Sequence, residues 1–80
     1  MARVVFPDHL LAATGGQREA EVFAENYRDL VEKLESKWPG IRESLSRSAV
    51  AIDGQIYQDA FLEPLEPASE LFFMPRIEGG

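Results

Sequence analysis

Apolar residues change their spacing along the chain, and these changes predict the order of the elements. Residues 3–6 form a short β-branched run that is typical of a buried strand. Residues 19–24 alternate between polar and apolar side chains, which predicts a half-buried strand antiparallel to the first. The segment between them, residues 8–17, contains Gly15 and Gly16 and is expected to be a loop.

An amphipathic helix is the most strongly patterned element. Its apolar residues recur at helical spacing and form one stripe of Tyr27, Leu30, Val31, Leu34 and Trp38. Asn26 and Asp29 resemble a capping arrangement at its start, and Pro39-Gly40 ends it. We therefore expect one long helix after the first two strands.

The second half of the chain is expected to contain shorter elements. Residues 41–48 are predicted to form one or two loose turns, and residues 49–57 to form two strands around Asp53-Gly54, a strong hairpin signal. Prolines interrupt residues 61–67, and residues 71–74 predict a final strand. This order of elements predicts a two-layer α+β domain with the long helix on one face of a sheet.

Composition and charge narrow the class of protein. The 80 residues, of which 45% are hydrophobic, suffice for one small core but not for two. The chain has no cysteine, which excludes disulfides and thiolate ligands. A net charge of −6 argues against a nucleic-acid partner, because phosphates would be repelled. No apolar run approaches the roughly 20 residues that cross a bilayer, and no secretory signal is apparent, so we expect no membrane association and a cytoplasmic location.

The candidate chemistry lies at the last two residues, Gly79-Gly80, which follow a largely hydrophobic run over residues 70–78. A C-terminal glycine carboxylate is a main-chain group that another enzyme can activate. It is ionised at neutral pH and is a poor electrophile, so it needs that activation. The chain has no phosphate-binding loop of the G-x-x-x-x-G-K type, so a partner would have to bind ATP. A frayed end or a leftover linker would be the plainer interpretations of the same two glycines.

No other set of residues predicts catalysis by this chain alone. His9 has no second histidine or cysteine at ligand spacing, so no metal site is expected. Ser44, Ser46 and Ser48 are interpreted as ordinary serines, because no base is apparent for any of them. The chain is therefore not expected to be a complete enzyme or to bind a cofactor itself.

The element order and two short motifs occur together in a known family. One motif is Trp38-Pro39-Gly40-Ile41 at the end of the helix, and the other is Glu70-Leu71-Phe72-Phe73-Met74-Pro75 followed by Gly79-Gly80. With the Asp53-Gly54 hairpin, they resemble the ubiquitin-like β-grasp sulfur carriers of the MoaD/ThiS type, which include the small subunit of molybdopterin synthase. The resemblance implies a mixed sheet of four to five strands packed on one main helix. Residues 1–75 would form this β-grasp domain and residues 76–80 a flexible tail.

The resemblance also implies chemistry on Gly80 that other proteins carry out. An E1-like enzyme would use ATP to adenylate the terminal carboxylate, and a sulfur donor system would convert the acyl-adenylate to a thiocarboxylate. In the molybdopterin case, the large subunit of the synthase then takes up that sulfur. Arg76 and Glu78 depart from the family's commonest tail, where apolar or small residues are more usual, and they leave the acceptor pathway open.

A carrier of this kind also needs a docking surface. Alternation along the last strand predicts Leu71 and Phe73 in the core and leaves Phe72 and Met74 outward, with Phe72 exposed unless a loop or a second copy covers it. The same alternation predicts Ala49 and Ala51 outward on the neighbouring strand. Arg76 is expected either to meet an acidic rim on the activating enzyme or to remain solvated. The predicted partner contacts are Phe72, Met74, Pro75, Arg76, Ile77, Glu78, Ala49 and Ala51, and the predicted reacting residues are Gly80 and Gly79.

Several functions are compatible with this pattern. The leading hypothesis is a sulfur carrier in molybdopterin, and hence molybdenum cofactor, biosynthesis. Sulfur carriers for thiamin, cysteine or tRNA thiolation, and ubiquitin-like protein modifiers, use the same activation. A non-reactive β-grasp interaction module with incidental terminal glycines is the alternative from another class.

Overall fold

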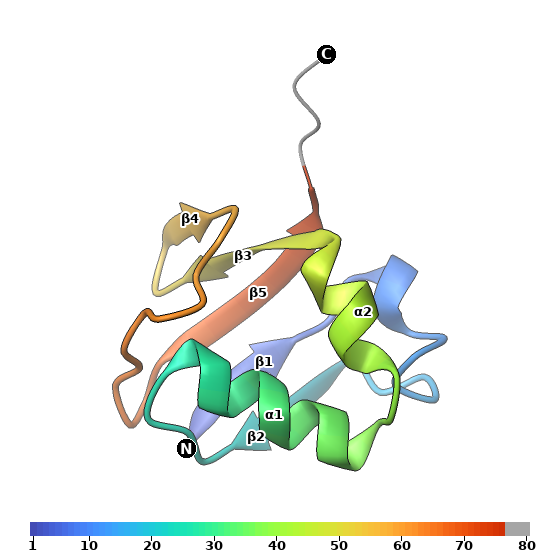
Figure 1. The fold of residues 1–80 in the computed structure, drawn as a ribbon, viewed down its shortest axis with the longest axis horizontal. Helices are drawn as coiled ribbons and strands as arrows, with labels where there is room; N and C mark the ends of the chain where they lie inside the picture. Colours follow the sequence, from blue (N-terminus) through green and yellow to red (C-terminus); the bar gives the residue numbers. More distant parts are fainter. Residues whose placement is uncertain (77–80) are drawn as a thin grey trace.

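The computed structural model describes residues 1–76, which form five strands, two α-helices and one 3-10 helix. In chain order these elements are β1 (Ala2–Val5), the 3-10 helix η1 (Asp8–Leu10), β2 (Glu19–Val22), α1 (Tyr27–Lys37), α2 (Ile41–Ser46), β3 (Ser48–Ile52), β4 (Gln55–Tyr57) and β5 (Glu70–Pro75). Figure 1 shows the strands as one sheet with both α-helices on the same side of it.

The sheet is mixed, and its strand order is β2-β1-β5-β3-β4. β1 pairs in parallel with β5, whereas the other three pairs, β1–β2, β3–β5 and β3–β4, are antiparallel. The first and last strands of the chain are therefore neighbours inside the sheet. This arrangement confirms the predicted α+β class and the mixed sheet.

The core lies between the helices and one face of the sheet. Its fully buried side chains come from both layers and include Val4, Leu10, Leu30, Leu34, Ile41 and Leu71. Phe6 stacks on Phe73 with ring centroids 6.2 Å apart and meets Trp38 edge-on at 5.6 Å. The predicted helical stripe therefore faces the sheet. Across residues 1–76 no helix has the length and apolar character that crossing a bilayer requires.

The hairpin between β3 and β4 turns at Asp53-Gly54, as the sequence predicts. Both residues have positive φ, 49° and 89°, which a two-residue hairpin turn of this kind requires. The Asp53 carboxylate accepts hydrogen bonds from the Ser69 hydroxyl at 2.8 Å and from the Glu70 N–H at 2.9 Å. These bonds hold the turn against the beginning of β5.

The prediction of loose turns after the long helix was wrong, because residues 41–46 form the short helix α2. Gly40 enters α2 with a φ of 99°, and Ile41 and Leu45 are buried against the core. The Glu35 carboxylate of α1 accepts from the N–H groups of Gly40 at 2.7 Å and Arg42 at 2.9 Å. Six residues show too little periodicity to predict a helix, and the capping group comes from the preceding helix rather than from α2 itself.

Candidate docking face and tail root

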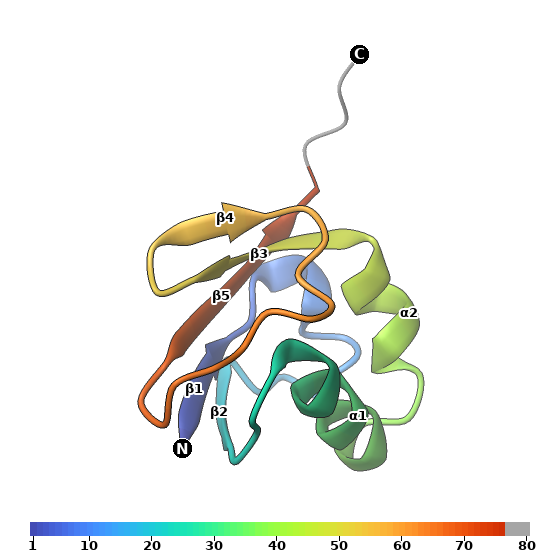
Figure 2. The ribbon, with the colours of Figure 1, turned by 60° about the vertical axis from the view of Figure 1, so that its left-hand side comes forward.

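β5 places its side chains alternately on the two faces of the sheet, as expected from the sequence. Leu71 and Phe73 lie in the core with exposed fractions of 0% and 4%. Phe72 is 42% exposed on the opposite face, where Met74 is half-buried. Figure 2, which views the sheet from its side, shows both described α-helices on the core side, so neither covers the face that carries Phe72. We refer to this uncovered side as the open face.

Apolar side chains from four strands form a row across the open face. The register pairs Val5 of β1 with Phe72 of β5. It also pairs Ala51 of β3 with Phe72 on one side and with Ile56 of β4 on the other. Directly paired residues project from the same face with Cβ atoms about 5 Å apart, so the four side chains are neighbours. We call Val5, Ala51, Ile56, Phe72 and Met74 the open-face patch.

Two members of the open-face patch, Val5 and Ile56, were not among the residues singled out from the sequence. The signal for Ile56 was available, because a two-residue turn at Asp53-Gly54 places Ala51 opposite Ile56. Val5 could not be placed, because its partner Phe72 on β5 is 67 residues away in the chain and periodicity gives no register for such a pair. Ile56 is 57% exposed, which makes it the most exposed member of the patch.

Ala49 requires a correction. It is paired with Met74 and therefore lies on the predicted side of the sheet, but it is only 1% exposed. A methyl group on an inner strand lies below the longer side chains beside it, and Met74 is its direct neighbour. Ala49 thus supports the packing of Met74 and offers no contact surface itself, whereas Ala51 is half-buried.

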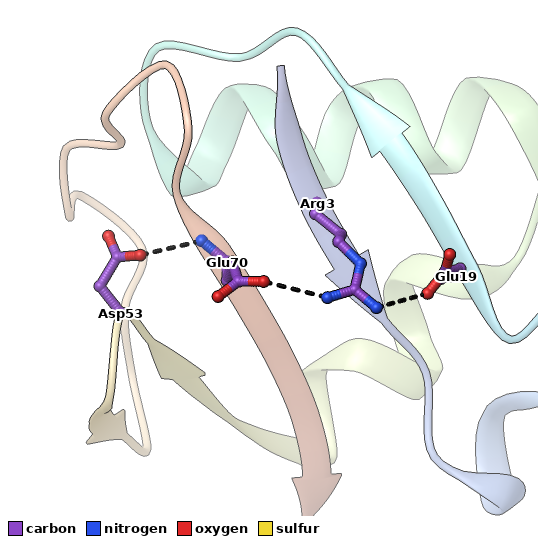
Figure 3. Close-up of polar contacts among 4 residues, drawn as sticks. All are labelled: Arg3, Glu19, Asp53 and Glu70. Carbon is purple, nitrogen blue, oxygen red and sulfur yellow. Dashed lines mark hydrogen bonds and ion pairs between the residues drawn. The ribbon is translucent and has the colours of Figure 1, made fainter.

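Ion pairs border the open-face patch at the end of the sheet where β5 begins. Arg3 donates to Glu19 at 2.8 Å and to Glu70 at 3.0 Å, and the Glu70 N–H donates to Asp53 (Figure 3). The bonds to Glu19 and then to Glu70 raise the pKa of the Arg3 guanidinium. The line of contacts joins β2, β1, β5 and the β3–β4 turn. The charged groups of this border are thus paired within the chain, whereas neither α1 nor α2 covers the apolar row beside them.

The opposite end of the open face leads to the tail. β5 ends at Pro75, and the exposed Arg76 follows directly. The guanidinium of Arg76 donates to the backbone oxygen of Ser46 and to two oxygens of Gln58. Ile77, Glu78, Gly79 and Gly80 lie outside the described residues, so their assigned roles stay predictions.

An open pocket of about 490 Å³ lies on the helix side, next to the tail root. α1, α2 and the segment after β4 line it, with Tyr27, Leu45, Asp59, Phe61 and Arg76 among the lining residues. Burial, followed by the charge of Asp59, raises the pKa of Tyr27 to about 12. The Tyr27 phenol is therefore neutral at physiological pH and serves as a packing group beside Phe73.

The structure brings His9 and Ser48 together, although no sequence pattern predicts this contact. His9 Nε2 lies 3.0 Å from Ser48 Oγ, and Ser48 Oγ is also 3.0 Å from the Ser44 carbonyl oxygen. A hydroxyl has one proton, and the carbonyl can only accept, so Ser48 donates to Ser44 and the imidazole donates to Ser48. This direction is opposite to that of a base activating a nucleophile. Because Ser48 is 5% exposed, the pair is a structural link between η1 and β3.

Among residues 1–76, no three side chains of the metal-binding types gather into one site.

Comparisons with known proteins place the fold. No protein-family profile matches the chain, and no curated protein matches it significantly. Among solved structures, a chain of the Amycolatopsis orientalis BexX/CysO complex is 19% identical, and the match covers 100% of both chains with a TM-score of 0.86. Mycobacterium tuberculosis CysO is 16% identical, with 96% of this chain and 100% of that chain covered and a TM-score of 0.85.

A third similar structure comes from an archaeon. The small archaeal modifier protein 1 (SAMP1) of Methanosarcina acetivorans is 18% identical, with 99% of this chain and 95% of that chain covered and a TM-score of 0.80. At these identities the likeness shows the fold, which is the ubiquitin-like β-grasp. Function has to be argued from the site.

Proposed function

We propose that this chain is a carrier whose terminal glycine carboxylate is activated by an E1-like enzyme and loaded with sulfur as a thiocarboxylate. The main support is the position of the open-face patch relative to the tail. Phe72 and Met74 lie on β5, the strand that ends at Pro75 and continues into the tail. A partner that binds the patch is thereby next to the start of the segment that ends at Gly80.

The chemistry requires a second protein. A carboxylate oxygen of Gly80 would attack the α-phosphorus of ATP and displace pyrophosphate, which gives an acyl-adenylate. Hydrosulfide released by the donor system would then attack the same carbonyl carbon, displace AMP and leave a thiocarboxylate. This chain has no cysteine and no phosphate-binding loop. The activating enzyme and the donor system therefore supply both the ATP site and the sulfur.

The length and composition of the tail suit this transfer. The five residues from Arg76 to Gly80 would span about 16 Å if fully extended, at roughly 3.3 Å each, which is enough to enter a neighbouring active site. Glycine at both last positions has no Cβ and passes a narrow channel in any backbone conformation that the channel demands.

For the acceptor, we propose the large subunit of molybdopterin synthase. The proposal draws support from the ending Phe72-Phe73-Met74-Pro75, the full-length helix α1 and the extended segment between β1 and β2. Within the sulfur carriers, these three features favour the small subunit of that enzyme over the carriers for thiamin or cysteine. Similarity to CysO and SAMP1 does not bear on this choice.

Conjugation to other proteins is a second candidate function. The likeness to a protein named a small archaeal modifier favours it, because a modifier needs the same activated glycine. The two outcomes differ in the nucleophile that takes the acyl group, a sulfur donor in one case and a lysine amine in the other.

Loading can be tested by incubating the full chain with ATP, an E1-like enzyme and a sulfur donor. We expect the intact mass to rise by the difference between one sulfur and one oxygen. Deletion of Gly80, or the addition of residues after it, should abolish the rise while circular dichroism and the melting temperature stay nearly unchanged. A mass that stays constant with every competent activating enzyme would favour the non-reactive module, and isopeptide-linked products would favour the modifier.

A further inference from the structure

Arg76, the first residue after β5, is held by two other segments of the same chain. Its Nε donates to Gln58 Oε1 at 3.2 Å, and one Nη donates to the Gln58 backbone oxygen at 3.1 Å. The other Nη donates to the Ser46 backbone oxygen at 3.3 Å. Figure 2 shows the end of β5 beside the junction of α2 with β3 and beside the segment that follows β4.

These acceptors match the shape of a guanidinium. Its donors diverge in one plane and reach separate acceptors at once, which the single ammonium of a lysine cannot do in the same geometry. Ser46 is the last residue of α2, where carbonyl groups lack partners within the helix, so Arg76 satisfies one of them. None of the three acceptors is a carboxylate. The arrangement therefore fixes a position rather than neutralising a charge.

We propose that Arg76 is a positioning residue that fastens the root of the tail and sets the direction in which the chain leaves the sheet. The inference rests on the proposed loading of Gly80, which it deepens. When the root is fixed relative to the docked face, the terminal carboxylate loses less entropy on reaching the partner's reactive centre. Arg76 would then act on the reaction step through its own chain and not by contacting the activating enzyme.

Direct pairing of Arg76 with an acidic rim on the enzyme makes different predictions. An ion pair with a partner mainly changes association, is screened by salt and is largely preserved by lysine. If Arg76 instead holds the tail root, its substitution mainly changes kcat, and the change does not depend on salt. Lysine should then lower kcat as much as alanine does.

The kinetic test compares Arg76→Ala and Arg76→Lys in the loading reaction at low and high salt. We expect both to lower kcat about tenfold and to leave KM within about twofold. Arg18→Ala is the matched control, because it removes one positive charge from a side chain that is 72% exposed and that, within residues 1–76, pairs only with Asp8. Arg18→Ala should load like the parent chain. A kcat in Arg76→Lys that equals that of the parent chain, or a salt-dependent rise in KM with kcat unchanged, would overturn the proposal.

Two further measurements test whether the contacts of Arg76 with its own chain cause the effect. In the free full-length chain, the NMR order parameter of the Arg76 Nε–H should exceed about 0.6, and that of Arg18 should be lower. Gln58→Ala should lower kcat, and its effect should largely vanish in an Arg76→Ala background, because both changes break the same contact. Additive effects or a disordered Arg76 Nε–H would overturn the proposal. If the parent chain is not loaded at all, the proposed function fails, and the NMR comparison decides alone whether Arg76 is held.

Discussion

Phe72 and Phe73 are consecutive residues of the same type, yet they belong to opposite faces of the sheet. Phe73 is 4% exposed and packs between Phe6 and Tyr27, whereas Phe72 is 42% exposed beside Val5 and Ala51. Both are equally hydrophobic, so hydrophobicity alone does not separate a stabilising residue from a binding one. The difference arises because helices cover one face of this sheet and not the other. We therefore expect substitutions on the two faces to have different consequences.

The largest effect should come from Phe73→Ala on the covered face. Removal of a buried phenylalanine typically costs about 3–5 kcal/mol of unfolding free energy, because contacts are lost and a cavity remains. Chemical denaturation monitored by circular dichroism measures this loss. If the variant does not fold, Phe73→Leu should still show a smaller and measurable loss. Stability unchanged in both variants would contradict the assignment of the core face.

Phe72→Ala on the open face should behave in the opposite way. We expect it to reduce the free energy of unfolding by less than about 1 kcal/mol and to weaken binding to the activating enzyme at least about tenfold. Calorimetry or a surface-binding assay measures the affinity. Leu62→Ala is the matched control, because Leu62 is 77% exposed and lies outside the open-face patch. A Phe72 variant that binds normally, or a Leu62 variant that binds as weakly, would contradict the role of the patch.

The sequence alone predicts some of these face assignments but not others. Alternation along β5 was enough to separate Phe72 from Phe73, because a strand exposes successive side chains to opposite faces. It was not enough for Ala49, whose burial depends on the length of its neighbour Met74 rather than on its own face. Val5 entered the patch only through a pairing with a strand at the other end of the chain.

The short helices and the contacts between distant segments could not be predicted from the sequence for similar reasons. α2 is capped by Glu35 from another helix, and η1 is tied to β3 through His9 and Ser48. Arg76 was expected to be solvated or to pair with a partner's acidic rim, whereas its three acceptors come from Ser46 and Gln58. Such contacts join segments that no local pattern brings together.

The stability of the protein at alkaline pH tests the burial of Tyr27 on the covered face. Because burial raises the pKa of Tyr27 to about 12, the folded state favours the neutral phenol. This stabilisation is fully present below the unfolded-state pKa of about 10 and is lost as the pH rises towards about 12. Tyr27→Phe should therefore lose less stability over this range than the parent chain. Equal losses, measured by denaturation across the pH series, would show that Tyr27 is not buried as described.

The smallest effect is expected from Glu35, which links the two helices of the covering layer. Hydrogen bonds from the N–H groups of Gly40 and then Arg42 hold the pKa of this carboxyl below its usual range. The folded state therefore gains stability above the unfolded-state pKa of about 4.3 and loses it as the pH falls through the lower folded-state value. Glu35→Gln should melt below the parent chain at neutral pH, and the gap should narrow in acid. A gap that stays constant with pH would contradict the capping role of Glu35.

Tandem mass spectrometry of the C-terminal peptide after loading shows whether the terminal carboxyl group of Gly80 carries the sulfur. We expect sulfur to replace one oxygen at Gly80 and every other residue of the peptide to keep its unmodified mass. Sulfur on another residue, or an unmodified peptide after incubation with a competent activating enzyme, would contradict the proposed loading of Gly80.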